Sequence, residues 1–147
     1  MSLPHRLQKV VDRFASAPRE LKGQALLRYG EKVPPLPTEY AEDRSRLAQV
    51  HECQTPFFLA TELDEEGGVH FFFDCPPEAP TIRGYAGILR EGLEGEHHSV
   101  VLDVPTNFYL AMGLEDVVSP MRLRGMRAIL AAVRRSVRSR LGGNGAS

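Results

Sequence analysis

Apolar residues near the N-terminus of the chain recur at the spacing of one helical face. They occupy relative positions i, i+4, i+7, i+8 and i+11, as Leu3, Leu7, Val10, Val11 and Phe14. Successive residues of a helix are about 100° apart, so these five side chains fall on one side. The pattern predicts an amphipathic helix that packs one face on the core.

A second helical segment is predicted over residues 18–29, with Leu21 and either Leu26 or Leu27 as core residues. The run VPPLP, residues 33–37, cannot continue this helix, because proline lacks an amide donor and restricts the residue before it. A polar connection is expected to follow, up to the first strand.

Two β-prone runs, FFLATEL at 57–63 and VHFFF at 69–73, are separated by the acidic and glycine-containing segment DEEGG. Glycine supplies the positive φ that tight turns need. These features predict an antiparallel hairpin with its turn centred near Glu66.

The second half of the chain has three further helical segments. One is predicted over Pro80–Leu93, interrupted by Gly84 and Gly87, and a short one over Thr106–Met112 is expected to end at a left-handed Gly113.

The final helix has the clearest signals. Ser119 is a good N-cap, and Pro120 suits the first helical position. Apolar residues then form a stripe at helical spacing: Met126, Ile129, Leu130, Val133, Val137 and Leu141. We expect one domain over residues 1–141 and a disordered tail over 142–147.

Charge is distributed unevenly along the 147 residues. The net charge is -1, but residues 117–147 carry seven arginines and no acid, whereas residues 1–116 carry 11 Lys/Arg and 19 Asp/Glu. The overall balance predicts no general attraction to nucleic acid or membrane. No run approaches the ~20 apolar residues of a membrane span, and the N-terminus lacks the apolar region of a signal peptide, so we expect a cytoplasmic protein.

The two cysteines, Cys53 and Cys75, are too few for a disulfide scaffold or a usual structural zinc site. In a reducing compartment both are expected to be thiols, and no metal site is expected.

Cys53 stands in QVHECQTPFFLA, between polar residues and before the apolar run, where we expect it to lie unburied in a loop. No cluster of Lys or Arg surrounds it in the sequence, and Glu52 disfavours the thiolate. A thiol that receives a group from a partner needs reach more than activation, and a loop provides reach. The alternative is an incidental loop thiol.

Arg122 falls within the apolar stripe of the last helix, whereas most other arginines of that helix point away from it: Arg124, Arg127, Arg134, Arg135 and Arg138. An inward arginine needs an ion partner, such as Glu78, or a place at the rim of a site. Both interpretations stay open, and the outward arginines are expected to form a solvated face.

Cys75 follows the second strand of the predicted hairpin. Antiparallel pairing brings the start of the first strand beside the end of the second, so Cys53 is expected to approach the segment Cys75–Glu78. The two thiols would then be close enough for a disulfide or a sulfur transfer, although Cys75 alone is typical of a buried packing residue.

Three segments at these positions resemble the SufE family of sulfur acceptors: VHECQT around Cys53, EAPTIRG beginning at Glu78, and VSPMRLRGM containing Arg122. Their order and spacing are similar to the family over almost the whole chain. The sequence departs from the commoner pattern at Glu52 and Cys75, where glycine is usual, which affects the loop conformation.

The resemblance implies an α+β fold, in which a small antiparallel sheet packs against helices from both ends of the chain, in agreement with the element order above. It also implies that Cys53 takes persulfide sulfur from a SufS-type cysteine desulfurase, stimulates it, and relays the sulfur to an iron-sulfur cluster scaffold. His51, Glu78 and Arg122 would support transfer or partner contact. Pyridoxal phosphate belongs to the desulfurase, so no cofactor and no independent turnover are expected here.

Two other functions compete with this interpretation. A non-catalytic adaptor would bind a desulfurase or another partner through the arginine-rich last helix, with Cys53 incidental. A thiol-redox protein would use Cys53 and Cys75, but the sequence has no CxxC motif.

Overall fold

In the computed structural model of the chain, the described residues are 3–53 and 55–142. They form helices around a three-stranded antiparallel sheet of order β1-β2-β3. The elements are α1 (His5–Ser16), α2 (Arg19–Glu31), α3 (Thr38–Ala41), η1 (Arg44–Arg46), β1 (Ala48–Gln49), β2 (Phe58–Leu63), β3 (Val69–Asp74), α4 (Pro80–Leu93), α5 (His98–Asp103), η2 (Phe108–Met112), η3 (Leu114–Asp116) and α6 (Pro120–Leu141).

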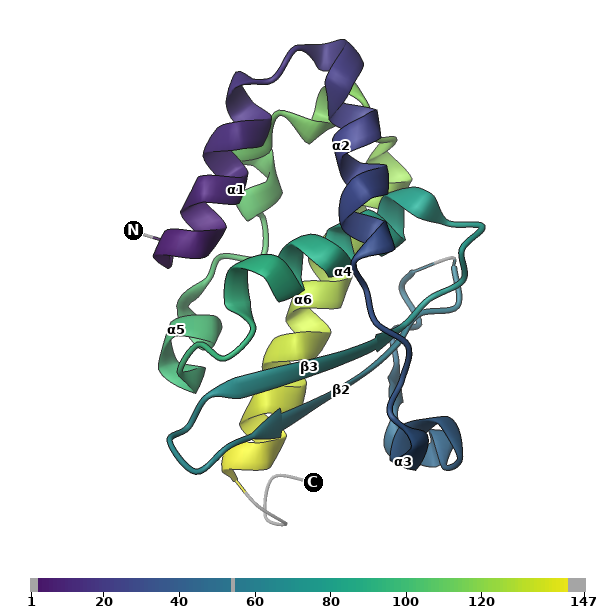
Figure 1. Cartoon of the computed structure of the whole chain (residues 1–147), viewed down its shortest axis with the longest axis vertical. Coiled ribbons are helices and arrows are strands. Elements are labelled where there is room, and N and C mark those ends of the chain that lie inside the picture. The colour runs from purple at the N-terminus through teal and green to yellow at the C-terminus, as the bar shows by residue number, and fades with distance from the viewer. Residues whose placement is uncertain (1–2, 54, 143–147) are drawn as a thin grey trace.

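The predicted α+β class is confirmed. The long helix α6 crosses one face of the hairpin and contacts β2, while α1 and α2 pack on α4 at the end of the molecule remote from the hairpin (Figure 1). The small element α3 lies on the other side of the sheet (Figure 1). Helix α4 therefore lies between the N-terminal helices and the sheet, and helices α1, α2, α4 and α6 enclose the core.

The predicted hairpin is present, with β2 beginning one residue later and β3 ending one residue later than predicted. Its register places Thr61 opposite Phe71 and Leu59 opposite Phe73. These four side chains are buried on the face toward α6, where the Thr61 hydroxyl is 2.6 Å from the Ser136 hydroxyl. The alternation of buried and part-buried residues along β3 follows from the two-residue period of a strand.

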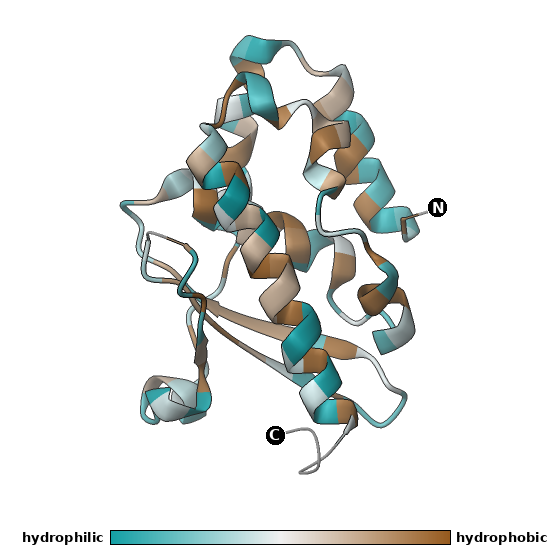
Figure 2. Cartoon of the chain, turned by 180° about the vertical axis from the view of Figure 1, so that it is seen from behind, coloured by the Kyte–Doolittle hydropathy of each residue, from teal (hydrophilic) through white to brown (hydrophobic). Residues whose placement is uncertain are grey.

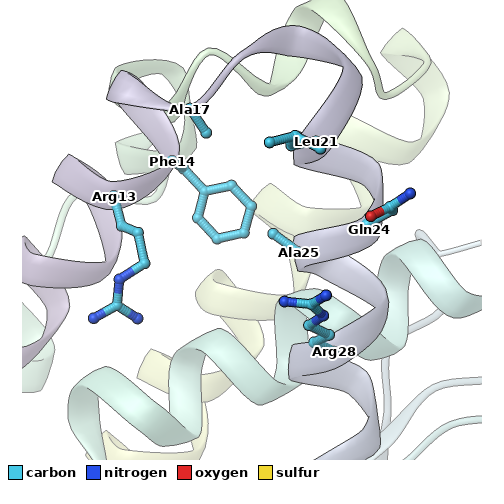
Figure 3. Close-up of a pocket in the computed structure, with 7 residues that line it drawn as sticks. All are labelled: Arg13, Phe14, Ala17, Leu21, Gln24, Ala25 and Arg28. Carbon is cyan, nitrogen blue, oxygen red and sulfur yellow. The ribbon is translucent and has the colours of Figure 1, made fainter.

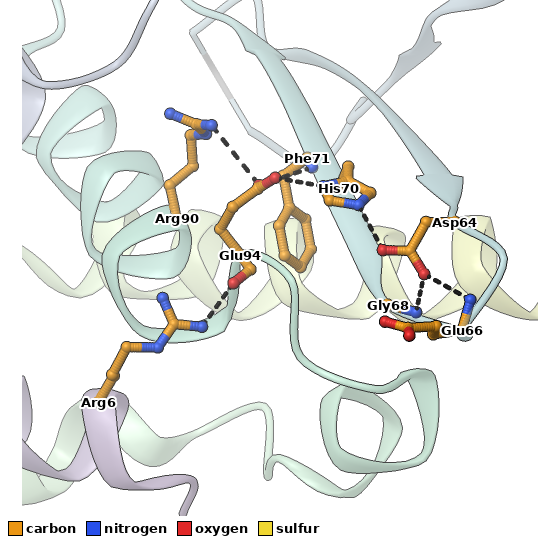
Figure 4. A network of polar contacts seen from close by, with 8 residues as sticks. All are labelled: Arg6, Asp64, Glu66, Gly68, His70, Phe71, Arg90 and Glu94. Atoms are coloured by element: carbon orange, nitrogen blue, oxygen red, sulfur yellow. Dashed lines mark hydrogen bonds and ion pairs between the residues drawn. The ribbon is translucent and has the colours of Figure 1, made fainter.

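The open edge of β3 is covered by the end of α4 (Figure 4). One carboxylate oxygen of Glu94 accepts the Phe71 backbone N–H at 3.0 Å, and the other lies 2.6 Å from His70 Nδ1. The second ring nitrogen of His70 lies 2.8 Å from Asp64, whose other oxygen accepts the Gly68 N–H at 2.8 Å and so holds the hairpin turn. His70 thus joins the turn to the end of α4, and Glu94 replaces a missing strand partner.

Helix α4 has the predicted bounds, but Gly84 and Gly87 do not interrupt it. A Cβ at Gly84 would lie 2.3 Å from the Leu26 carbonyl oxygen, and one at Gly87 would lie 2.0 Å from the Tyr29 carbonyl oxygen. Both glycines are there because α2 approaches the backbone of α4 so closely that no side chain fits.

Other sequence predictions need correction. In α2 the core residue is Leu26, whereas Leu21 and Leu27 are half exposed, and Leu141 at the end of α6 is also exposed. The expected polar connection before the hairpin contains α3, η1 and β1, and helix α5 was not predicted. Ser119 caps α6 and Gly113 is left-handed, both as predicted. The predicted tail falls mostly on residues 143–147, outside the described part of the chain.

Candidate functional site

Cys53 lies in the connection between β1 and β2, so the predicted loop position is confirmed. The Val50 N–H donates to the Phe57 carbonyl at 2.9 Å, which extends the pairing of β1 with β2 by one residue. The Cys53 N–H then donates to the Val50 carbonyl at 3.3 Å. The backbone therefore turns at Cys53 directly beyond the sheet.

The thiol is buried, with 8% of Cys53 exposed, so the expectation of an unburied cysteine is wrong. It forms one wall of a cavity of about 210 Å³ whose other walls come from α4, α6 and the loop itself. The lining residues are Cys53, Thr55, Ile82, Met121, Arg122 and Gly125. Helices that lie far away in the sequence thus close over the loop.

Two opposing effects act on the Cys53 thiol. Burial raises its pKa, because a thiolate is poorly solvated there, while a backbone hydrogen bond at Thr55 and the positive charge of Arg122 lower the pKa. Burial is the larger effect. In the described conformation the sulfur is therefore held mainly as a thiol.

Arg122 is exposed, although its helical phase predicted an inward direction. It lies in the first turn of α6, where its backbone N–H donates to the Ser119 hydroxyl at 3.3 Å, and its side chain lines the Cys53 cavity. Among the described residues no ion pair joins it to Glu78. Of the two interpretations left open by the sequence, the rim of a site is the one the geometry favours.

The other two predicted support residues, His51 and Glu78, are exposed and do not line the cavity. His51 precedes Cys53 in the same turn, and Glu78 lies in the connection between β3 and α4. Their positions leave them available to a partner rather than to the thiol itself.

Cys75 is buried, as a packing cysteine would be, and both cysteines are free thiols. The Arg83 guanidinium donates to the Cys75 carbonyl at 2.9 Å and lies 3.9 Å from its sulfur. Burial raises the pKa of Cys75 to about 11, although the charge and the hydrogen bond of Arg83 act in the opposite direction. The register pairs Phe58 with Asp74, so Cys75 follows β3 at the end of the hairpin where the Cys53 loop enters β2, as predicted.

Sequence reasoning missed Ile82, Met121 and Gly125 as parts of this site. Gly125 carried a usable signal, because a glycine inside a strongly predicted helix usually has a packing or functional reason. A Cβ at Gly125 would lie 3.4 Å from the Cys53 sulfur and 3.6 Å from Ile82 Cδ1.

A second cavity, of about 190 Å³, lies between α1 and α2 (Figure 3). Phe14, Leu21 and Ala25 give it an apolar interior, with Arg13 and Arg28 at one side. It contains no nucleophilic side chain, so it does not compete with the Cys53 cavity as a group-transfer site.

Within residues 3–53 and 55–142, no cluster of three or more His, Cys, Asp or Glu side chains is placed to bind a metal. No helix in that part of the chain has the length and apolar character to cross a membrane.

Comparison with known proteins gives one consistent result. A family described as SufE, an Fe-S metabolism associated domain, matches residues 8–137. An uncharacterised SufE-like protein of Mycobacterium tuberculosis is 42% identical over 137 residues, which cover 93% of this chain and 94% of that protein. The sulfur acceptor protein CsdE of Escherichia coli is 26% identical over 115 residues, covering 78% and 75%. A hypothetical protein of Thermus thermophilus with a solution structure shares 44% identity and superposes with a TM-score of 0.86 over 97% of this chain and 100% of that chain.

Proposed function

The chain belongs to the SufE family, and from this premise we propose that it accepts persulfide sulfur from a SufS-type cysteine desulfurase on Cys53 and relays that sulfur to an iron-sulfur cluster scaffold. The observation that carries the proposal is the Cys53 thiol in the wall of a cavity that Arg122 borders.

The proposed step is a thiol exchange. The Cys53 thiolate attacks the outer sulfur of the desulfurase persulfide, a new S–S bond forms on Cys53, and the old S–S bond breaks to leave the desulfurase cysteine as a thiolate. The sulfane sulfur moves without any net oxidation or reduction. The pyridoxal phosphate chemistry that generates the persulfide takes place on the desulfurase, so this chain needs no cofactor for the step.

The burial of Cys53 would protect a stored persulfide, and the position of Arg122 would assist its formation. A buried Cys53 persulfide would be shielded from competing thiols, since Ile82 and Met121 occupy the cavity wall. The Arg122 guanidinium would favour the anionic forms, both the attacking thiolate and the resulting persulfide. His51, exposed in the Cys53 loop, and Glu78, exposed between β3 and α4, would contact the desulfurase.

The experiment combines the protein with a purified cysteine desulfurase, cysteine and pyridoxal phosphate, followed by an intact-mass measurement. We expect a gain of one sulfur atom that reduction removes. The gain should be absent in Cys53→Ser and present in Cys75→Ser, which removes the other thiol as a matched control. A wild-type protein that gains no sulfur under these conditions would refute the acceptor function.

The relay requires a second measurement. The sulfur-loaded protein, separated from the desulfurase, is mixed with an apo scaffold complex, ferrous iron and a dithiol reductant, which supplies the electrons that convert sulfane sulfur to sulfide. Cluster formation is followed by absorbance. We expect cluster formation only with the loaded protein. We place this exchange in the reducing cytoplasm, where both cysteines stay thiols.

A further inference from the structure

The exposed side of α6 carries a stripe of four arginines: Arg124, Arg127, Arg135 and Arg138. At 100° per residue these side chains fall within an arc of about 80°, opposite the buried face of the helix, and they span about 21 Å along its axis. Figure 2 shows α6 from this side, with hydrophilic bands along its length. We call these four residues the arginine stripe.

No described residue neutralises the arginine stripe. The seven ion pairs of the described residues involve no arginine of α6, and none of the four guanidiniums donates a side-chain hydrogen bond. By contrast, Arg134 and Arg140 on the same helix donate to the carbonyls of Val104 and Thr61. No acid occurs in residues 117–147. The arginine stripe therefore produces a region of concentrated positive potential on a protein whose net charge is -1.

The stripe begins beside the Cys53 cavity. The first turn of α6 supplies Met121 and Arg122 to the cavity wall, and Met121 is 45% exposed. Met121 and Arg124 are about 60° apart around the helix, so they are neighbours on its surface. A partner that reaches the cavity past Met121 therefore lies against the start of the stripe.

We propose that the arginine stripe docks an acidic surface of the cysteine desulfurase and directs the approach of that enzyme to Cys53. This inference rests on the proposed function, since it assumes that a desulfurase is the partner. Guanidinium groups form bidentate hydrogen bonds with carboxylates, so an acidic protein face is a fitting complement.

The fold argues against a membrane or a nucleic acid as the occupant. A membrane-bound helix inserts an apolar face, whereas the apolar face of α6 is buried in the core. Nucleic-acid-binding domains are typically strongly basic, whereas this chain has a net charge of -1 and its basic excess is confined to α6.

The test measures association of the full chain with the purified desulfurase at low and at physiological salt. The variants are Arg124→Glu with Arg127→Glu, and Arg135→Glu with Arg138→Glu. The control is Lys9→Glu with Arg28→Glu, which changes the net charge equally at exposed positions of α1 and α2 that make no ion pair in the described structure. We expect each stripe variant to lower the association rate constant about tenfold at low salt, less at physiological salt, and the control to change it little.

Three outcomes would overturn the docking proposal. They are an unchanged rate in both stripe variants, an equal loss in the control, or binding of a labelled 20-base-pair DNA duplex more tightly than the desulfurase at the same salt. Circular dichroism of each variant confirms that it is folded. The sulfur gain of the wild-type chain is measured in parallel: its absence refutes the acceptor function, whereas a normal gain with an unaffected association rate refutes only the docking.

Discussion

Substitution of Gly125 by alanine should affect stability and sulfur uptake in opposite directions: the helix becomes more stable, while the Cys53 cavity loses room for the persulfide. In Gly125→Ala the added methyl carbon would lie 3.4 Å from the Cys53 sulfur, an ordinary van der Waals contact, so the thiol form accommodates it. The persulfide form differs, because its outer sulfur is bonded to the first at about 2.05 Å. An outer sulfur directed toward the methyl carbon would overlap it, so that side of the cavity is closed to the product.

The expected stability change has the opposite direction. Alanine inside a helix is more favourable than glycine by about 0.5–1 kcal/mol, and no clash offsets this gain at Gly125. For a chain of this size that corresponds to a rise in Tm of roughly 1.5–3 °C. Gly23→Ala is the matched control, since Gly23 lies within α2 with nothing within 4 Å of an added Cβ.

The assay combines thermal unfolding with the rate of sulfur gain by intact mass. We expect both alanine variants to raise Tm, but only Gly125→Ala to slow the gain, and Gly125→Leu to prevent most of it because three further carbons enter the cavity. If Gly125→Leu remains folded and gains sulfur at the wild-type rate, the outer sulfur does not use this cavity and the reasoning fails.

Three further predictions concern other parts of the molecule. Arg122→Ala should slow sulfur transfer at saturating desulfurase more than Arg135→Ala does, because only Arg122 borders the cavity; equal losses would contradict this. Hydrogen bonds to Glu94 and then to Asp64 raise the pKa of His70, so its contribution to stability is complete below about pH 6.5 and is lost as the pH rises through the raised value. The Tm deficit of His70→Gln should therefore be largest in acid and shrink in alkali, and a deficit independent of pH would count against a protonated His70. Mild peroxide treatment should produce a Cys53–Cys75 disulfide detectable by non-reducing peptide mapping, since the pairing of Phe58 with Asp74 brings the Cys53 loop to the end of β3; without that crosslink Cys75 is a packing residue only.

Elements with strong local signals were predictable from the sequence. Pro80 and Leu93 bound α4 as predicted, and Ser119 caps α6, because caps, prolines and apolar periodicity act within a few residues. The meaning of Gly84 and Gly87 was not predictable, since a glycine in a helix looks like a break until the neighbouring backbone is known. In this protein that backbone belongs to α2, more than fifty residues away.

The burial of Cys53 also results from contacts with segments distant in the sequence, and it changes the chemistry expected of the thiol. Polar neighbours in the loop suggested an accessible thiol, but Ile82 and Gly125 approach it from α4 and α6, and no local pattern records those contacts. A thiol that is buried, with a raised pKa, is a poor nucleophile in the resting fold. Under the proposed function, sulfur uptake therefore requires the partner to alter the surroundings of Cys53, either by drawing the loop outward or by displacing Met121, which is already half exposed at the cavity wall. Displacement of Met121 requires the partner to contact the first turn of α6 before the chemistry, so by that route the rate of sulfur transfer should depend on how the desulfurase engages that turn as well as on the thiol itself.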